Sequence, residues 1–413
     1  NPCLTSTASV VPIYVSQKPN ASFSITPKDT ICKNSNITFT NTSGNNSYVN
    51  APNCSDGKVV WEITPATGWT INNGNLGNTY SSADPNFWVS GTASISINFN
   101  TIGTYSVKFK AGNPVCGMDS SIKVICVNPT PTASFSLSNT SGCSPLVVTA
   151  NGSTNTPNCG TNIFVWNTTY TPASNCTPNT SSVNYVGGTS SSSANPQLQF
   201  NNPGTYNVNL YTVAPNNACT SPITTQQIVV KSKPNVSAIS GNSSVCQNGT
   251  LNPNVTVGNC NSNTTPTYVW SFTGASPTTS TQQTPGAITF TNSGSQTMSV
   301  DVTNECGTSN VTKTINVTSA PSVTPPSDKT FCAGIATGAI NFSGTGTSYS
   351  WTNSNTAIGL NASGTTSSPT IPSFNATNNG TSPITATISV TSISGCNGVP
   401  QTFTITINPK PAK

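Results

Sequence analysis

A short pattern around tryptophan recurs four times along this chain of 413 residues. The repeats are spaced by roughly 80 to 105 residues, which is about the size of a seven-stranded β-sandwich domain. Such a sandwich buries one tryptophan of its third strand against the facing sheet. We therefore expect a core role for four residues: Trp61, Trp166, Trp270 and Trp351.

The segments around these tryptophans alternate between apolar and polar residues. Ser94 to Phe99 and Thr402 to Ile407 are examples, and this period of two indicates half-buried strands. Hydrophobic residues make up 33% of the chain, enough to form cores although only 5% of residues are charged. No segment of a dozen residues has the spacing of an amphipathic helix. The sequence predicts an all-β fold.

Each pattern ends in a strand-like run and a link that contains proline, which sets the expected boundaries. Residues 1–18 then correspond to the end of a preceding repeat. The four complete units, called repeats 1 to 4 below, are residues 19–129, 130–233, 234–320 and 321–413. Each has an early cysteine (Cys32, Cys143, Cys246 or Cys332) and a late cysteine in a turn (Cys116, Cys219, Cys306 or Cys396).

Several short motifs recur in the repeats. They are the openings Pro19 to Phe23 and Pro131 to Phe135, the third-strand tryptophan, and the runs Gly103 to Val107 and Gly204 to Val208. Together they resemble PKD-like repeats of secreted Bacteroidetes surface proteins. The familiar motif after the tryptophan is reduced to Trp270 to Gly274 in one repeat and absent from the others. The resemblance implies a tandem array of immunoglobulin-like (PKD-like) β-sandwiches in an extracellular cell-surface adhesin, exported by type IX secretion and associated with gliding motility.

The 14 cysteines are interpreted as disulfide partners, because the chain lacks both histidine and a Cys-x-x-Cys motif. Disulfides persist in oxidising compartments, so we expect an exported protein. The opening residues do not have the pattern of a signal peptide, and we expect no membrane span because no long apolar run occurs. We interpret it as a mature form or an internal fragment of a longer protein.

The order of loops in a sandwich predicts which cysteines lie at the same end of a repeat. We expect three pairs at one end: Cys54–Cys116, Cys159–Cys219 and Cys260–Cys306. Two pairs are expected at the other end: Cys32–Cys126 and Cys143–Cys176. In a head-to-tail array Cys246 would reach Cys396 of the next repeat, Cys332 a following repeat and Cys3 a preceding one. The alternative, that all disulfides lie within repeats, remains open for Cys246 and Cys396.

The composition argues against an enzyme. Nucleophilic catalysis usually needs a histidine base, and the chain has none. Asp301 and Glu305 are the nearest acidic pair, and they are interpreted as solvated loop residues. With only eight acidic residues, we expect no metal site, and no motif indicates a cofactor. Basic residues are scattered, which gives no support for a nucleic-acid partner.

Two further features suggest interactions at the surface. Asp29-Thr30-Ile31 fits the O-glycosylation pattern of Bacteroidetes, so Thr30 is a candidate acceptor if the family resemblance holds. Trp69 and the pair Phe87–Trp88 could form a sugar-stacking platform, or could pack an insertion of repeat 1.

We expect a structural stalk or filament segment of a large adhesin, stiffened by disulfides. Its partners would be neighbouring repeats of the same chain and surface polysaccharide or glycans, with no membrane span in this fragment. The alternatives are a glycan- or surface-binding module and accessory domains of an exported hydrolase.

Overall fold

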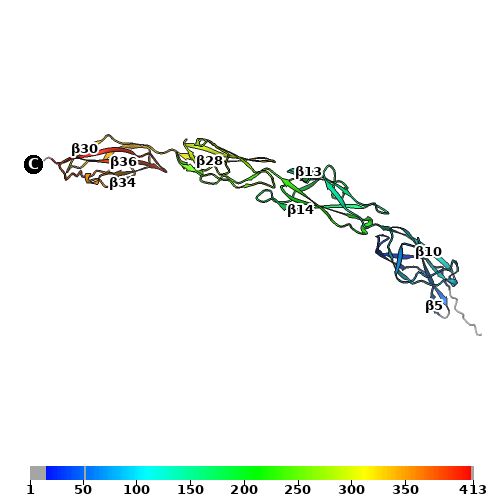
Figure 1. The fold of residues 1–413 in the computed structure, drawn as a ribbon. Helices are drawn as coiled ribbons and strands as arrows, with labels where there is room; N and C mark the ends of the chain where they lie inside the picture. The colour runs from blue at the N-terminus through cyan, green and yellow to red at the C-terminus, as the bar shows by residue number, and fades with distance from the viewer. Residues whose placement is uncertain (1–14, 51–52, 411–413) are drawn as a thin grey trace, which may run out of the picture. The chain divides into compact units, whose positions relative to one another are not determined.

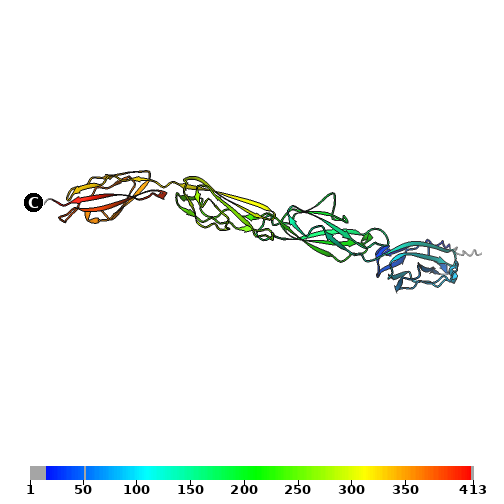
Figure 2. The same ribbon diagram turned by 45° about the horizontal axis from the view of Figure 1, so that its top comes forward.

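The computed structural model describes residues 15–50 and 53–410. The chain is all-β, as predicted, and forms a tandem array of immunoglobulin-like sandwiches (Figures 1 and 2). It divides into two compact units. The first holds the described residues up to Pro172 together with Asn179–Val230, and the second holds Ala173–Pro178 with the residues from Lys231 onward.

Repeat 1 consists of two four-stranded sheets and a hairpin. The sheet orders are β1-β3-β8-β7 and β2-β10-β9-β6, and β4 pairs with β5. The elements are β1 (Phe23–Thr26), β2 (Thr30–Cys32), β3 (Ser35–Asn41), β4 (Ser47–Asn50), β5 (Asn53–Asp56), β6 (Lys58–Thr64), β7 (Trp69–Asn73), the 3₁₀ helix η1 (Pro85–Phe87), β8 (Ser94–Phe99), β9 (Gly103–Asn113) and β10 (Gly117–Asn128).

Repeat 2 has the same two sheets, ordered β11-β13-β16-β15 and β12-β18-β17-β14. Its elements are β11 (Ser134–Leu137), β12 (Ser141–Cys143), β13 (Leu146–Ser153), β14 (Ile163–Pro172), β15 (Val183–Val186), β16 (Gln197–Phe200), β17 (Gly204–Val213), η2 (Pro215–Asn217) and β18 (Thr224–Lys231).

Repeat 3 places its longest strands in the sheet β20-β28-β27-β23-β25, which faces the short pairings β21-β26-β24 and β19-β22. Its elements are β19 (Asn235–Val236), β20 (Ser244–Cys246), β21 (Thr250–Leu251), β22 (Val257–Gly258), β23 (Thr267–Phe272), β24 (Ala275–Ser276), β25 (Thr279–Ser280), β26 (Ile288–Phe290), β27 (Gly294–Asn304) and β28 (Gly307–Thr318).

Repeat 4 is built around the sheet β30-β38-β36-β33-β34, in which β37 also pairs with β36. Figure 2 shows its strands in two layers, coloured orange and red. Its elements are β29 (Val323–Thr324), β30 (Lys329–Cys332), β31 (Ile340–Asn341), β32 (Ser343–Gly344), β33 (Ser348–Asn353), η3 (Thr356–Ile358), β34 (Ser363–Thr366), β35 (Thr370–Ile371), β36 (Ile384–Ser394), β37 (Cys396–Asn397) and β38 (Gln401–Asn408).

The first strand of repeat 1 changes sheets halfway, and this places its early cysteine. β1 pairs antiparallel with β3, whereas β2 crosses to the other sheet and pairs parallel with the last strand, β10. In that register Cys32 lies opposite Asn128, the final residue of β10. The early cysteine is thus at the end of the repeat where the chain leaves it.

The four tryptophans are buried, with exposed fractions of 5% or less. Each belongs to a different cluster of buried apolar residues, and these clusters lie within residues 21–127, 135–230, 239–317 and 323–407. Trp61 Nε1 donates a hydrogen bond to the Thr92 carbonyl oxygen at 3.0 Å. Burial of a large aromatic side chain with its polar atom paired is favourable for a sandwich core.

A tyrosine supports the turn before the sixth strand in the first two repeats. Tyr105 donates its hydroxyl to the Thr101 carbonyl at 2.9 Å, and Tyr206 donates to Asn202 at 3.0 Å. This is the tyrosine corner of immunoglobulin-like sandwiches. Burial raises the pKa of both tyrosines, so the hydroxyls remain donors at neutral pH.

Candidate functional site: the junctions between repeats

Two disulfides join repeat 1 to repeat 2. Cys32, at the end of β2, is bonded to Cys219 in the hairpin between β17 and β18, with a Cα–Cα distance of 6.2 Å. Cys126 of β10 is bonded to Cys159, in the loop before β14, with a Cα–Cα distance of 6.5 Å. Both Cα separations fall in the range that a disulfide requires. With the main chain, the junction has three covalent connections.

Hydrogen bonds hold the first of these disulfides in place. The Lys28 ammonium donates to the Asn216 carbonyl oxygen and, at 3.3 Å, to that of Asn217. Asn216 in turn donates its side-chain amide to the Thr30 hydroxyl at 3.0 Å. These contacts join the strand that ends in Cys32 to the turn that precedes Cys219.

The second disulfide is positioned by Asn128, the last residue of β10. Its side-chain oxygen accepts the backbone N–H groups of Asn158 at 2.8 Å and of Cys159 at 3.0 Å. Asn128 itself is fully buried, and these two hydrogen bonds fix the loop that carries Cys159.

The segment after β14, residues 173–178, groups with the part of the chain that begins at Lys231. Cys176 is bonded to Cys260, with a Cα–Cα distance of 5.5 Å, and both cysteines are buried with Ala173. Asn235 donates its amide to the Asn175 carbonyl at 3.0 Å. Residues 173–178 therefore lie within the sequence range of repeat 2 but pack on the loops that open repeat 3.

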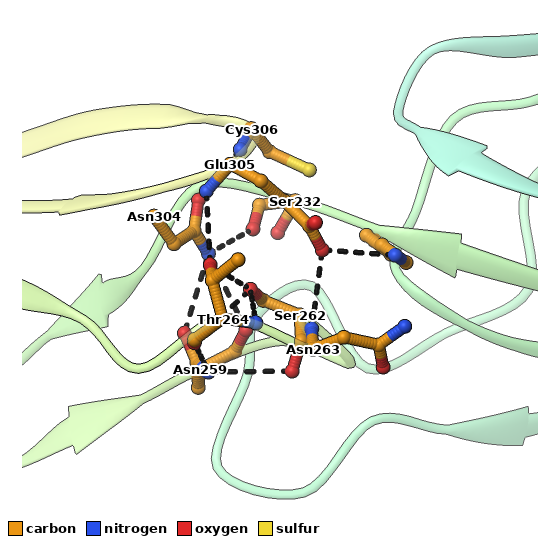
Figure 3. A network of polar contacts seen from close by, with 9 residues as sticks. Ser232, Asn259, Ser262, Asn263, Thr264, Asn304, Glu305 and Cys306 are labelled. Carbon is orange, nitrogen blue, oxygen red and sulfur yellow. Dashed lines mark hydrogen bonds and ion pairs between the residues drawn. The ribbon is translucent and has the colours of Figure 1, made fainter.

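A polar network joins the linker before repeat 3, at Ser232, to the hairpin between β27 and β28 (Figure 3). The buried Asn304 amide donates to the Ser232 carbonyl at 2.9 Å. Glu305 pairs with Lys231 at 2.9 Å and accepts the Asn263 backbone N–H at 3.1 Å. The hydrogen bond from Lys231 and, to a lesser degree, the one from Asn263 hold the pKa of the Glu305 carboxyl below its ordinary value. The linker, the hairpin and the loop before β23 are thus joined at one point.

An equivalent hydrogen bond between a hairpin asparagine and the linker occurs at the start of repeat 1. Asn113 is fully buried in the hairpin between β9 and β10 and donates its amide to the Gln17 carbonyl at 3.2 Å. Its side-chain oxygen accepts the Cys116 backbone N–H at 2.6 Å. Gln17-Lys18-Pro19 corresponds to Ser232-Lys233-Pro234, so an asparagine of the hairpin holds equivalent linker residues in both repeats.

Cys246, at the end of β20, is bonded to Cys396 of β37, with a Cα–Cα distance of 5.8 Å. This is the pair that the head-to-tail argument predicted between repeats 3 and 4. Cys143 and Cys306 are disulfide-bonded as well.

Five predicted pairings within repeats are wrong: Cys54–Cys116, Cys159–Cys219, Cys260–Cys306, Cys32–Cys126 and Cys143–Cys176. Cys32, Cys126, Cys159 and Cys219 are instead bonded to the adjoining repeat, and Cys176 is bonded to Cys260. Cys54, Cys116 and Cys332 have free thiols in the part of the chain that the structure describes. Cys3 lies outside that part.

The predicted glycosylation site and the predicted aromatic platform can both be located in the structure. Thr30 is 8% exposed and its hydroxyl accepts from Asn216, so the folded chain leaves no space there for a glycan. Trp88 is buried and Trp69 packs against the core of repeat 1, whereas Phe87 is exposed. The insertion therefore packs its tryptophans and forms no aromatic platform from them.

Asp301 and Glu305 do not act as a pair. Asp301 accepts a hydrogen bond from the Asn310 amide at 2.6 Å, whereas Glu305 pairs with Lys231. No cluster of three metal-binding side chains occurs among residues 15–50 and 53–410. Over the same residues there is no helix with the length and apolarity needed to cross a bilayer.

Comparisons with known proteins find similar chains only among solved structures. No family model matches the chain, and no curated protein matches it. Similar solved structures include three immunoglobulin domains of titin (12% identity, TM-score 0.33, 73% of this chain and 100% of that chain). The eight N-terminal immunoglobulin domains of Down syndrome cell adhesion molecule give 12% identity and a TM-score of 0.32, covering 95% of this chain and 49% of that chain.

Sidekick-1 immunoglobulin domains 1–5 give 13% identity and a TM-score of 0.29, covering 94% of this chain and 81% of that chain. The fold assignment of this chain rests on its own strand order. Together, the sheets and junctions define an array of immunoglobulin-like sandwiches with disulfides between consecutive repeats.

Proposed function

We propose that this chain is a structural segment, a stalk or filament, of a secreted cell-surface adhesin. The observation that carries the proposal is the position of the disulfides. The pairs Cys32–Cys219, Cys126–Cys159, Cys176–Cys260 and Cys246–Cys396 each join sequence ranges of consecutive repeats. Disulfides placed this way strengthen the connections between domains, which is a mechanical role. The four repeats would act as separate domains coupled at their ends.

The disulfides also support an extracellular location, because they persist in oxidising compartments. The finer proposal is a protein that resembles the gliding-motility adhesin SprB of Bacteroidetes, exported by type IX secretion. It is supported by the PKD-like motifs around Pro19 and Gly103. In this proposal the chain is not an enzyme and its partners are its own neighbouring repeats. Glycan contact would be made by other parts of the parent protein, because Trp69 and Trp88 are packed.

The proposal predicts that the disulfides restrict motion at the junction of repeats 1 and 2. Ketone-bearing amino acids at the exposed positions Thr67 and Ser191 would carry spin labels without added cysteines. Domains without strong interfaces move relative to one another. Replacing Cys32, Cys126, Cys159 and Cys219 with serine should therefore broaden the distance distribution roughly twofold or more.

Cys332→Ser is the matched control, because it removes a cysteine that has no disulfide partner. Pulsed electron resonance should give this control the narrow distribution of the native chain. Equally narrow distributions in the native chain and the four-serine variant would show that the disulfides do not set the stiffness of the junction.

A further inference from the structure

Cys332 occupies the position from which two other cysteines reach the next repeat. Cys32 ends β2 opposite Asn128, and Cys246 ends β20 opposite Thr318. Each early strand runs parallel to the last strand of its repeat, and each cysteine is bonded to the late cysteine of the following repeat. Cys332 ends β30 opposite Asn408 in the same parallel register, with an exposed and free thiol.

Cys116 occupies the complementary position at the other end of a repeat. It lies between Asn113 and Gly117, which pair across the hairpin, and its N–H is accepted by the Asn113 side chain. Cys306 lies between the paired residues Asn304 and Gly307, and its N–H is accepted by Asn304 at 2.9 Å.

Cys306 is disulfide-bonded, whereas Cys116 has a free thiol. The corresponding hairpins of repeats 2 and 4 carry Cys219 and Cys396. Each of these cysteines is disulfide-bonded to a cysteine of the preceding repeat. The register, the asparagine contact and the bonded equivalents all indicate that the hairpin of repeat 1 is built to receive a cysteine.

We propose that Cys332 and Cys116 are the two halves of a further disulfide between repeats. The partner of each is another immunoglobulin-like repeat that presents the complementary cysteine, and a second copy of this chain presents both. The contact joins two different surfaces head to tail, so it extends the array instead of forming a symmetric dimer. This inference rests on the proposed structural role of the junctions.

The bond forms by thiol–disulfide exchange with a low-molecular-weight disulfide. The two cysteine thiols lose two electrons and two protons and form one S–S bond, and the small disulfide is reduced to two thiols. Cys54 corresponds to Cys159 and Cys260, which bond to Cys126 and Cys176. Repeat 4 has only Cys332 and Cys396, so a second copy offers Cys54 no partner.

The test uses the full chain with Cys3→Ser, so that the thiols left to react are Cys54, Cys116 and Cys332. Concentrated protein in a buffer of oxidised and reduced glutathione should give a ladder of covalent multimers on a non-reducing gel. Peptide mapping should find Cys332 bonded to Cys116. Cys54→Ser should leave the ladder unchanged, because the proposal assigns that thiol no partner in a second copy.

Single variants make the test specific. Cys332→Ser alone and Cys116→Ser alone should each remain monomeric, whereas their mixture should form a dimer and nothing larger. A Cys332–Cys332 bond, a bond through Cys54, or monomer alone under these conditions would overturn the proposal. These outcomes would leave the internal junctions intact, so they are distinguishable from failure of the proposed structural role.

Discussion

Pulled from its two ends, the oxidised chain will extend far less than the reduced chain. The shortest covalent route through the molecule passes from Cys32 directly to Cys219, and from Cys246 directly to Cys396. These two disulfides bypass chain segments in which the bonded cysteines are 187 and 150 residues apart in sequence. An extended residue spans about 3.3–3.6 Å, so the two disulfides together withhold roughly 1,100 Å of chain even if every repeat unfolds. Single-molecule force spectroscopy with and without reductant measures this difference directly.

Two double variants distinguish a disulfide that lies on the shortest covalent route from one that does not. Cys126→Ser with Cys159→Ser removes a bond that lies wholly inside the bypassed segment, so it should not change the maximum extension. Cys32→Ser with Cys219→Ser should lengthen the chain by roughly 300 Å. The next route then runs through Cys126–Cys159 and Cys176–Cys260. Full extension of the oxidised native chain would contradict the account.

Replacing Trp270 with alanine should unfold repeat 3 while leaving the cores of repeats 1 and 4 folded. Trp270 is fully buried and stacks on Phe272 at a centroid distance of 5.7 Å. Truncating such a side chain costs about 3–5 kcal/mol, a large part of the 5–15 kcal/mol typical of a domain. Hydrogen exchange with mass spectrometry should show lost protection in β23 and β27.

Val269→Ala is the control for this variant, because Val269 directly precedes Trp270 in the same strand and is 55% exposed. Its protection pattern should match the native chain. Residues 173–178 pack on repeat 3 and should lose protection with it. Simultaneous loss of protection around Trp61 and Trp351 would show that the repeats are not separate folding units.

The sequence predicts the sandwich fold because its signals are local. Alternation such as Ser94 to Phe99 indicates strands, and the recurring tryptophan indicates one core in each repeat. The disulfide pairing is not local, because it depends on where strand ends lie between repeats. The sandwich topology places Cys32 near Cys126 at the exit of its repeat, but no local pattern shows that the hairpin of the next repeat meets Cys32 there.

One signal in the sequence could have corrected the pairing. Repeat 4 has a late cysteine, Cys396, but no cysteine in the loop before its tryptophan strand. The late cysteine therefore cannot depend on that loop for a partner. Applied to every repeat, the head-to-tail argument used for Cys246 and Cys396 also gives Cys32–Cys219. The position of residues 173–178 on repeat 3 has no comparable signal, because it follows from loop packing.

Peptide mapping of the native chain shows whether the disulfides join one repeat to the next. The protein is digested without reduction, with free thiols blocked beforehand, and linked peptides are identified by mass spectrometry. We expect the pairs Cys32–Cys219, Cys126–Cys159, Cys176–Cys260 and Cys246–Cys396. The pairs Cys159–Cys219 and Cys32–Cys126 would instead close each repeat on itself, and finding them would show that these disulfides do not join consecutive repeats.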